Sequence, residues 1–276
     1  MNHRIKMIGL DMDGTLLTTE KQLTAYTKQI LQEAIEQGIE VVLSTGRSIT
    51  GIPKELLETP GMRYAVTING ARIIDLQKNE VIYKNTLSMQ KALELLDIIG
   101  KFDAIQEAFI DSVCYSSKDK LLHANDYFLH PSIAEYVLKS RTPVEDVRAT
   151  VIEKNSSVDK VNGQFRNSED KKSSYELLTK VPGVVVVSSL GNNWEINAEG
   201  TDKGSAMLKL GELLGIRREE IMACGDGMND IAMLKAVGLG VAMANADPEV
   251  REAADYITTS NDEDGVAKAI EKFALK

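Results

Sequence analysis

The sequence predicts an α/β fold in which a parallel sheet carries a polar site where its strands end. Short apolar runs alternate with helical patterns near both ends of the chain, as they do in βαβ units. Polar segments that contain Asp11, Thr45 and Asp226 directly follow three of these apolar runs. A separate α/β module interrupts the pattern between residues 85 and 189.

The first predicted elements form one βαβ unit. Residues 5–10 and 39–43 are mostly apolar and predict two buried strands. Apolar residues at helical spacing predict a helix over 25–37, with Thr24 as its N-cap and Gly38 as its stop. Strands of such a unit lie parallel, with a right-handed crossover between them.

A third strand and a hairpin are expected to follow, and the interrupting module then has its own elements. The strand is predicted at 64–68 and the hairpin at 72–74 and 81–83. Within the module we expect a helix at 88–101, a strand at 104–115, a helix over 120–140 that Pro131 breaks or restarts, a strand at 158–165, a helix at 168–180 and a strand at 183–188. Trp194 is expected to start the strand that returns to the first sheet, with 196–198 as the return point.

The module is predicted to be an insertion because Asp11 and Asp226 lie far apart in the sequence. They meet only if the strands before them are neighbours in one sheet, and ligands bind outside the carboxyl ends of such strands. The core then comprises residues 1–84 and 190–276, and residues 85–189 form a lid that selects the substrate. Short linkers near both junctions suit a hinge.

Asp11 and Asp13 suggest the chemistry of the site. Two carboxylates at one strand end repel each other unless a cation or a proton holds them. A magnesium-assisted site, in which one carboxylate reacts and the other handles a proton, accounts for both. The alternative is an ordinary Asp-Gly turn that closes a hairpin.

Composition limits the partners and the compartment. The chain has 276 residues and a net charge of −9, with 32 basic and 41 acidic residues, which argues against a nucleic-acid or anionic-membrane surface. Its two cysteines, Cys114 and Cys224, do not indicate a disulfide framework, and Cys224 is expected to be buried as a small hydrophobe. Since we find no signal-peptide pattern and no membrane-length apolar stretch, we expect a cytoplasmic protein.

Four segments in order carry a family resemblance. They read Asp-Met-Asp-Gly-Thr at 11–15, Leu-Ser-Thr-Gly-Arg at 43–47, Gly-Thr-Asp-Lys-Gly at 200–204 and Cys-Gly-Asp-Gly-Met-Asn-Asp at 224–230. The chain resembles the haloacid dehalogenase (HAD) superfamily, and within it the Cof-type subgroup. The resemblance implies a Rossmann-like parallel sheet core with helices on both faces and an inserted α/β cap of the C2B type. It also implies Mg²⁺-dependent hydrolysis of small phosphorylated metabolites, such as sugar phosphates, through an aspartyl-phosphate. We expect the protein to be a monomer or a homodimer.

The same resemblance assigns roles to individual residues. Asp11 is the expected nucleophile, and Asp13 is the expected general acid and base. Lys203 is expected to act in catalysis and in phosphate binding. The other residues expected to bind phosphate are Met12, Thr45, Gly46 and Asn229. The expected magnesium ligands are Asp11, the main-chain carbonyl of Asp13, and Asp226, with Asp230 in support.

Some alternatives stay open at this point. A phosphomutase on the same fold would pass the phosphoryl group to a second hydroxyl, and a phosphate- or nucleotide-binding regulatory protein would not turn over at all. Arg47 either binds substrate phosphate or pairs with an acidic surface group, and we favour the pairing. No motif between residues 85 and 189 identifies the substrate.

Overall fold

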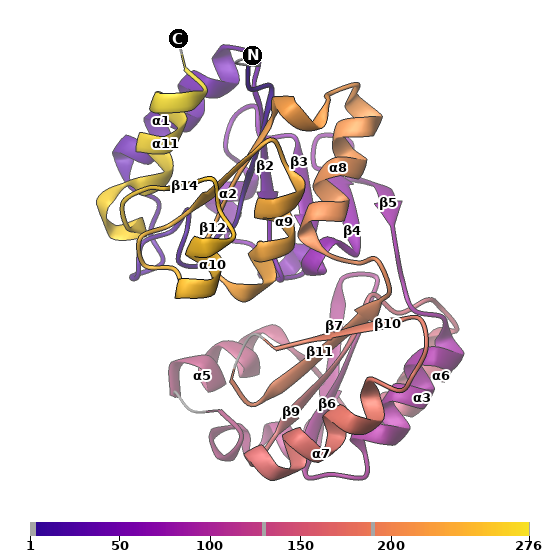
Figure 1. Cartoon of the computed structure of the whole chain (residues 1–276). Helices are drawn as coiled ribbons and strands as arrows, with labels where there is room; N and C mark the ends of the chain where they lie inside the picture. Colours follow the sequence, from indigo (N-terminus) through magenta and orange to yellow (C-terminus); the bar gives the residue numbers. More distant parts are fainter. Residues whose placement is uncertain (1–3, 129–130, 189–190, 276) are drawn as a thin grey trace. The chain divides into compact units, whose positions relative to one another are not determined.

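The computed structural model describes residues 4–128, 131–188 and 191–275. The chain divides into two compact units (Figure 1). The first consists of Met1–Arg47, Ile52–Lys84 and Asp202–Lys276, and the second of Ser48–Gly51 and Asn85–Thr201.

The first unit is built on a mainly parallel sheet. Over the described residues the sheet has eight strands in the order β14-β13-β12-β1-β2-β3-β4-β5. Their bounds are β1 (Met7–Leu10), β2 (Glu40–Ser44), β3 (Tyr64–Thr67), β4 (Arg72–Asp75), β5 (Glu80–Lys84), β12 (Ile221–Gly225), β13 (Leu239–Ala242) and β14 (Tyr256–Ile257). The sheet is parallel from β14 to β3, and β4 and β5 form the predicted antiparallel hairpin.

Helices cover both faces of this sheet, as predicted. They are α1 (Ala25–Glu36), α2 (Lys54–Leu57), α8 (Lys203–Leu214), α9 (Ile231–Ala236), α10 (Pro248–Glu252) and α11 (Gly265–Phe273). Figure 1 shows α1 and α11 together on one face and α8 and α9 on the other. The Thr24 side chain caps α1 by accepting from the Thr27 amide, and Gly38 follows the helix with φ +79°, so both predicted helix signals are confirmed.

The second unit has a sheet of its own. Over the described residues it has six strands in the order β10-β11-β9-β6-β7-β8. These are β6 (Ala104–Ile110), β7 (Val113–Ser117), β8 (Thr142–Val144), β9 (Lys160–Phe165), β10 (Val184–Val187) and β11 (Asn193–Ala198).

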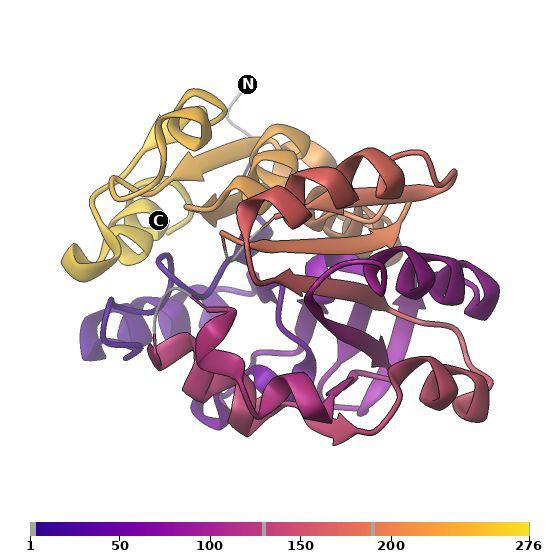
Figure 2. The same cartoon turned by 90° about the horizontal axis from the view of Figure 1, so that it is seen from below.

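The helices of the second unit are α3 (Met89–Ile99), α4 (Lys118–Leu121), α5 (Pro131–Ser140), α6 (Val147–Lys154) and α7 (Ser168–Leu178). Figures 1 and 2 show α3, α6 and α7 on one face of the sheet and α5 on the other. Side chains from α3, α6 and α7 bury Phe165 and Val161 of β9, so this unit has a separate hydrophobic core.

Two element predictions need correction. The strand predicted at 104–115 is a hairpin of β6 and β7, because Asp111 and Ser112 adopt φ +49° and +67° and reverse the chain. The helix predicted over 120–140 restarts at Pro131, as one of its two alternatives stated, but β8 and α6 were not predicted. Pro143 inside β8 concealed that strand, because proline argues against a strand except at the edge of a sheet, which is where β8 lies.

The predicted return point at 196–198 is wrong. These residues lie in β11, which pairs antiparallel with β10 and β9 in the second sheet. Trp194 of β11 packs against Tyr175 of α7, with ring centroids 4.8 Å apart. An apolar strand pattern does not reveal which sheet the strand joins, so the second unit ends at Thr201 and not at 189. Residues 189–190 of the second predicted linker lie outside the described residues.

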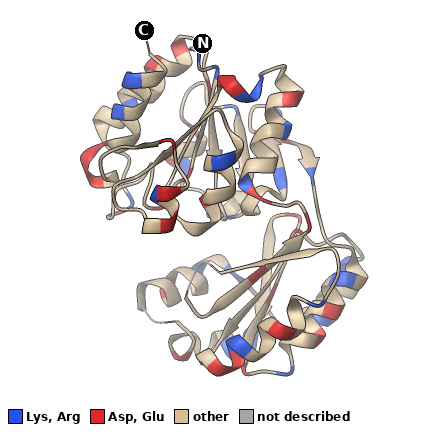
Figure 3. Ribbon diagram, in the orientation of Figure 1, with Lys and Arg blue, Asp and Glu red and all other residues tan. Residues whose placement is uncertain are grey.

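Other sequence expectations can be compared with the side chains. Cys114 and Cys224 are both buried and unpaired, and burial raises the pKa of Cys224 to about 12. In the portion of the chain that is described, no helix has the length and apolar character needed to cross a bilayer. Figure 3 shows acidic and basic residues interspersed on the outward helices, such as α3 and α7.

The position of β11 predicts which fragment can fold alone. We expect residues 85–201 to fold cooperatively, whereas residues 85–189 should not, because they lack the strand that joins β10 to β9. Thermal melting followed by circular dichroism of the two fragments tests this expectation. A cooperative transition for both fragments would contradict the assignment of β11 to this sheet.

Candidate active site

The candidate site lies where the central strands of the first unit end. Asp11 follows β1, Thr45 follows β2 and Asp226 follows β12, while Lys203 begins α8. Because β1 pairs with both β12 and β2 in parallel, these strand ends meet at one edge of the sheet. The neighbouring strands required by the sequence argument are therefore confirmed.

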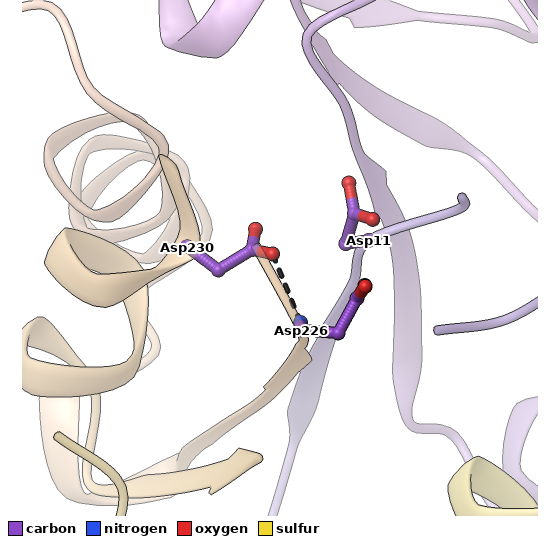
Figure 4. Close-up of side chains that lie close together, drawn as sticks. All are labelled: Asp11, Asp226 and Asp230. Atoms are coloured by element: carbon purple, nitrogen blue, oxygen red, sulfur yellow. Dashed lines mark hydrogen bonds between the residues drawn. The ribbon is translucent and has the colours of Figure 1, made fainter. Parts of the chain in front are cut away.

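Three carboxylates gather at this edge. One oxygen from each of Asp11, Asp226 and Asp230 lies within 4.8 Å of the others (Figure 4). Asp11 and Asp230 are buried, and Asp226 is partly buried. Carboxylates this close repel one another, so the cluster needs positive charge beside it.

Lys203 places a positive charge beside the carboxylate cluster. Its side chain is fully buried, and Nζ lies 2.6 Å from Oδ1 of Asp11 and 2.6 Å from Oδ1 of Asp230. Burial alone lowers the pKa of this lysine, but the two carboxylates outweigh that effect and raise it, so the ammonium stays charged. Burial and the other two carboxylates raise the pKa of Asp11, an increase that Lys203 only partly offsets.

Asp230 organises the loop that carries Asp226. Its Oδ2 accepts hydrogen bonds from the amides of Asp226 at 3.1 Å and Gly227 at 2.9 Å, and its Oδ1 accepts from Lys203 (Figure 4 shows the first of these). A Cβ at Gly225 would lie 2.5 Å from the Asp230 Cβ. Glycine at 225 therefore allows Asp230 to reach both the loop and the lysine.

Thr15 holds the side chain of Asp226. Its Oδ1 accepts a hydrogen bond of 2.6 Å from Thr15 Oγ1. Gly14, with φ +87°, passes so close that a Cβ there would lie 2.3 Å from Asp226 Oδ2. Burial raises the pKa of Asp226 to about 6, although the Thr15 bond acts in the opposite direction.

These residues fit a divalent cation with oxygen ligands. Three carboxylates lie close together and the Lys203 ammonium group contacts two of them, which leaves excess negative charge in a poorly solvated place. Mg²⁺ is bound in proteins by one or two carboxylates and keeps several waters. Asp11 and Asp226 fit that role, because both oxygens of Asp230 already accept hydrogen bonds.

The side chain of Asp13 lies outside the carboxylate cluster. Arg47 binds it with two hydrogen bonds, from Nε to Oδ2 and from Nη2 to Oδ1, each 2.7 Å long. Lys21 Nζ lies 2.8 Å from the same Oδ1. Burial raises the pKa of Asp13, but the two cations outweigh burial and lower it. Arg47 thus forms an ion pair as favoured, although its partner is a predicted catalytic residue rather than an acidic surface group.

The predicted phosphate-binding residues lie in the adjoining loops. The Thr45 hydroxyl accepts from the Arg47 amide at 3.1 Å, and a Cβ on Gly46 would lie 2.8 Å from Asn69 Oδ1. Asn229 donates to the same Asn69 oxygen at 3.2 Å. The buried Met12 lies between Asp11 and Asp13, just after β1, and its carbonyl accepts a hydrogen bond from the Leu17 amide.

Asn69 is a site residue that the sequence analysis missed. It lies in a 3₁₀ turn, η2 (Ile68–Gly70), directly after β3, and adopts the left-handed conformation with φ +57°. Its amide donates to the Thr45 carbonyl at 3.1 Å. The signal was present, because an Asn-Gly pair followed a predicted strand next to β2.

Carboxylates, one buried lysine and a cation-compatible cluster at the end of a parallel sheet are typical of enzymes that transfer phosphoryl groups. The chain belongs to the haloacid dehalogenase-like hydrolase family, whose model matches residues 8–270. The Cof-type resemblance seen in the motifs is thereby confirmed, and the enzyme is a phosphoric monoester hydrolase.

Similar proteins agree with this family. The chain is 33% identical to the 5-amino-6-(5-phospho-D-ribitylamino)uracil phosphatase YcsE of Bacillus subtilis, covering 98% of this chain and 96% of the relative. It is 30% identical to the phosphatase YwpJ of the same organism, covering 95% and 98%.

Solved structures share the fold. A haloacid dehalogenase-like hydrolase from B. subtilis superimposes with a TM-score of 0.84 at 28% identity, covering 97% of this chain and 99% of that one. A HAD-superfamily phosphatase from Bacteroides thetaiotaomicron gives a TM-score of 0.81 at 26% identity, covering 99% and 96%.

The carboxylate cluster predicts how cation binding responds to mutation. Asp226→Ala should raise the Mg²⁺ concentration needed for half-saturation by at least about tenfold, because it removes an anionic ligand from an ion that takes few from protein. Calorimetric titration with MgCl₂ measures this directly. Asp97→Ala, at an exposed carboxylate that pairs with Arg148, is the control. An unchanged requirement in Asp226→Ala would place the cation elsewhere.

Proposed function

We propose that this enzyme hydrolyses small phosphorylated metabolites, with Mg²⁺ bound, through a phosphoryl group carried on Asp11. The observation that supports the proposal most strongly is the contact of the buried Lys203 ammonium with Asp11 Oδ1 at 2.6 Å. A carboxylate attacks phosphorus only when it is ionised and held still. The lysine favours the ionised form and fixes one oxygen of the carboxylate.

The loops around Asp11 supply positive or hydrogen-bonding groups for a phosphoryl group. We assign phosphate binding to the amides near Met12, to Thr45 and Gly46, and to Asn229 and Lys203. Thr45 and Gly46 lie in the loop that Asn69 supports, and Asn229 donates to the Asn69 side chain. Such preformed donors lower the cost of developing charge, since they need no rearrangement during the reaction.

The cation belongs beside Asp11 and Asp226, with the main-chain carbonyl of Asp13 as a further ligand and Asp230 in support. When bound, Mg²⁺ would neutralise negative charge on the phosphoryl oxygens. The protein residues supply the attacking carboxylate, its orientation and the proton.

Asp13 is the group that we assign to proton transfer. It follows Asp11 by two residues, and its side chain is one-third exposed, whereas the Asp11 side chain is only 10% exposed. A proton donated to the leaving alkoxide and later taken from water would pass through this carboxyl group. One of its oxygens must therefore be available beside the Arg47 ion pair.

A phosphorylated sugar or polyol is the substrate class we propose. YcsE, as named, acts on a molecule with a phosphate on a ribityl chain. The second unit is the proposed selecting element, and one face of its sheet carries buried polar side chains. Asn162 donates to Glu107, which also pairs with Arg141, while Lys160 pairs with Glu195. Groups of this kind can hydrogen-bond hydroxyls and are costly to leave unpaired.

Asp11→Asn is expected to abolish turnover of 4-nitrophenyl phosphate while the protein stays folded. The amide is nearly isosteric with the carboxylate but does not attack phosphorus, so activity should fall by at least about 10⁴, a loss consistent with removal of a catalytic nucleophile. Initial rates at saturating MgCl₂ and a thermal melt measure the two effects. Retention of more than a tenth of wild-type activity would exclude Asp11 as the nucleophile.

Asp13→Asn is expected to slow turnover by about 10²–10⁴, as loss of a general acid and base does. The decrease should be larger for a sugar phosphate than for 4-nitrophenyl phosphate, because nitrophenolate leaves without a proton. Values of kcat/KM for glucose 6-phosphate and 4-nitrophenyl phosphate give the comparison, because they exclude the later hydrolysis of the aspartyl-phosphate that both esters share. Equal losses on both esters would argue against proton transfer by Asp13.

A further inference from the structure

Lys21 is a charged residue near the site that the family motifs do not include. Its Nζ lies 2.8 Å from Asp13 Oδ1, although the lysine side chain itself is 56% exposed. Arg47 Nη2 also donates to that oxygen, whereas Oδ2 accepts only the Arg47 Nε bond among the contacts described. The two oxygens of Asp13 are therefore unequal, with Oδ1 held by two cations.

The backbone at Lys21 is unusual for this residue type. Lys21 adopts φ +62°, in the left-handed region where glycine is the unstrained choice. Its amide donates to the Thr18 carbonyl at 2.8 Å, and the Thr18 amide donates to the Gln22 carbonyl at 3.0 Å, so the turn is closed on both sides. Formation of this turn does not require a lysine side chain. The contact with Asp13 is what the side chain adds.

The turn is anchored to a distant part of the first unit. Thr19 donates from its amide and from its hydroxyl to the two carboxylate oxygens of Asp262, at 2.8 and 2.7 Å. The Leu17 carbonyl accepts from the Asn261 side chain at 3.0 Å. Both anchors lie in η6 (Asn261–Glu263), which follows β14. These hydrogen bonds fix the segment before Lys21 to the core of the first unit.

We propose that Lys21 is a positioning residue for Asp13. It anchors Oδ1 together with Arg47, so that Oδ2 is the oxygen that exchanges the proton with the leaving group and with water. This inference rests on the proposed function, because it gives Asp13 the proton-transfer role. It adds a residue, an oxygen and a supporting turn to that role.

Three variants of Lys21 separate its charge from its backbone conformation. Lys21→Met keeps the length but removes the charge, Lys21→Arg restores a cation, and Lys21→Gly removes the charge while relieving the left-handed backbone. Lys6→Met is the matched control, since Lys6 Nζ also lies 2.8 Å from a carboxylate, Glu220, and its side chain is 50% exposed. Lys6 precedes β1, at the opposite end of that strand from Asp11.

The assay compares two esters of similar shape, benzyl phosphate and 4-nitrophenyl phosphate. Only the first has a leaving group that needs a proton. Because both esters give the same phosphorylated Asp11, the comparison uses kcat/KM, which reports only the steps up to departure of the leaving group. We expect kcat/KM for benzyl phosphate to fall about tenfold in Lys21→Met and Lys21→Gly, a fraction of the 10²–10⁴ effect of the acid itself. The rate on 4-nitrophenyl phosphate should change less than about twofold, Lys21→Arg should recover most of the loss, and Lys6→Met should match the wild type.

Other results would overturn the proposal. Equal losses on both esters would indicate a structural role, and a raised KM with unchanged kcat would place Lys21 on the substrate phosphate. Wild-type rates in Lys21→Gly, combined with a lowered melting temperature in Lys21→Met, would assign the effect to the turn. The Lys21 proposal fails while the proposed function stands if the wild type hydrolyses both esters, Asp11→Asn hydrolyses neither, and the Lys21 variants keep the wild-type ratio of the two rates. If the wild type hydrolyses neither ester, the proposed function fails as well.

Discussion

The buried ammonium group of Lys203 is the interaction on which the rest of the site depends. It lies 2.6 Å from both Asp11 and Asp230, and Asp230 in turn holds the amides of the loop that carries Asp226. Removing one member of a buried charge network leaves the other charges uncompensated. This costs more free energy of unfolding than the intact ion pair contributes. One lysine thus couples the helix α8, the end of β1 and the end of β12.

Close backbone approaches make this convergence possible. Gly14 and Gly225 both lie where a Cβ would collide with a carboxylate of the cluster, at 2.3 and 2.5 Å from the nearest atoms of Asp226 and Asp230. At a third position, Gly204 on α8 packs so tightly on α9 that a Cβ would lie 2.5 Å from the Ala232 carbonyl oxygen. Glycine at these three positions therefore allows the carboxylates of the cluster and the start of α8 to come close together.

Most of the core and its site could be predicted from the sequence, because the signals are local. Three of the four motifs follow an apolar strand of the first sheet, and the carboxyl ends of parallel neighbours must meet, so the common edge of Asp11, Thr45 and Asp226 could be predicted without coordinates. What could not be predicted depends on tertiary pairing. The pattern of β11 is that of any buried strand, and only its partners β9 and β10 assign it to the second unit. The ion pair of Arg47 with Asp13 and the approach of Lys21 depend on side-chain directions that spacing does not encode.

The central claim is that the phosphoryl group passes through Asp11, and it can be tested on the wild-type enzyme. The reaction with excess 4-nitrophenyl phosphate and MgCl₂ is quenched in acid during turnover, and the peptides are analysed by mass spectrometry. The account predicts a mass increase of one phosphoryl group on the peptide that contains Asp11, located on that residue by fragmentation. A phosphoryl group found on another residue, at a level that accounts for turnover, would contradict it.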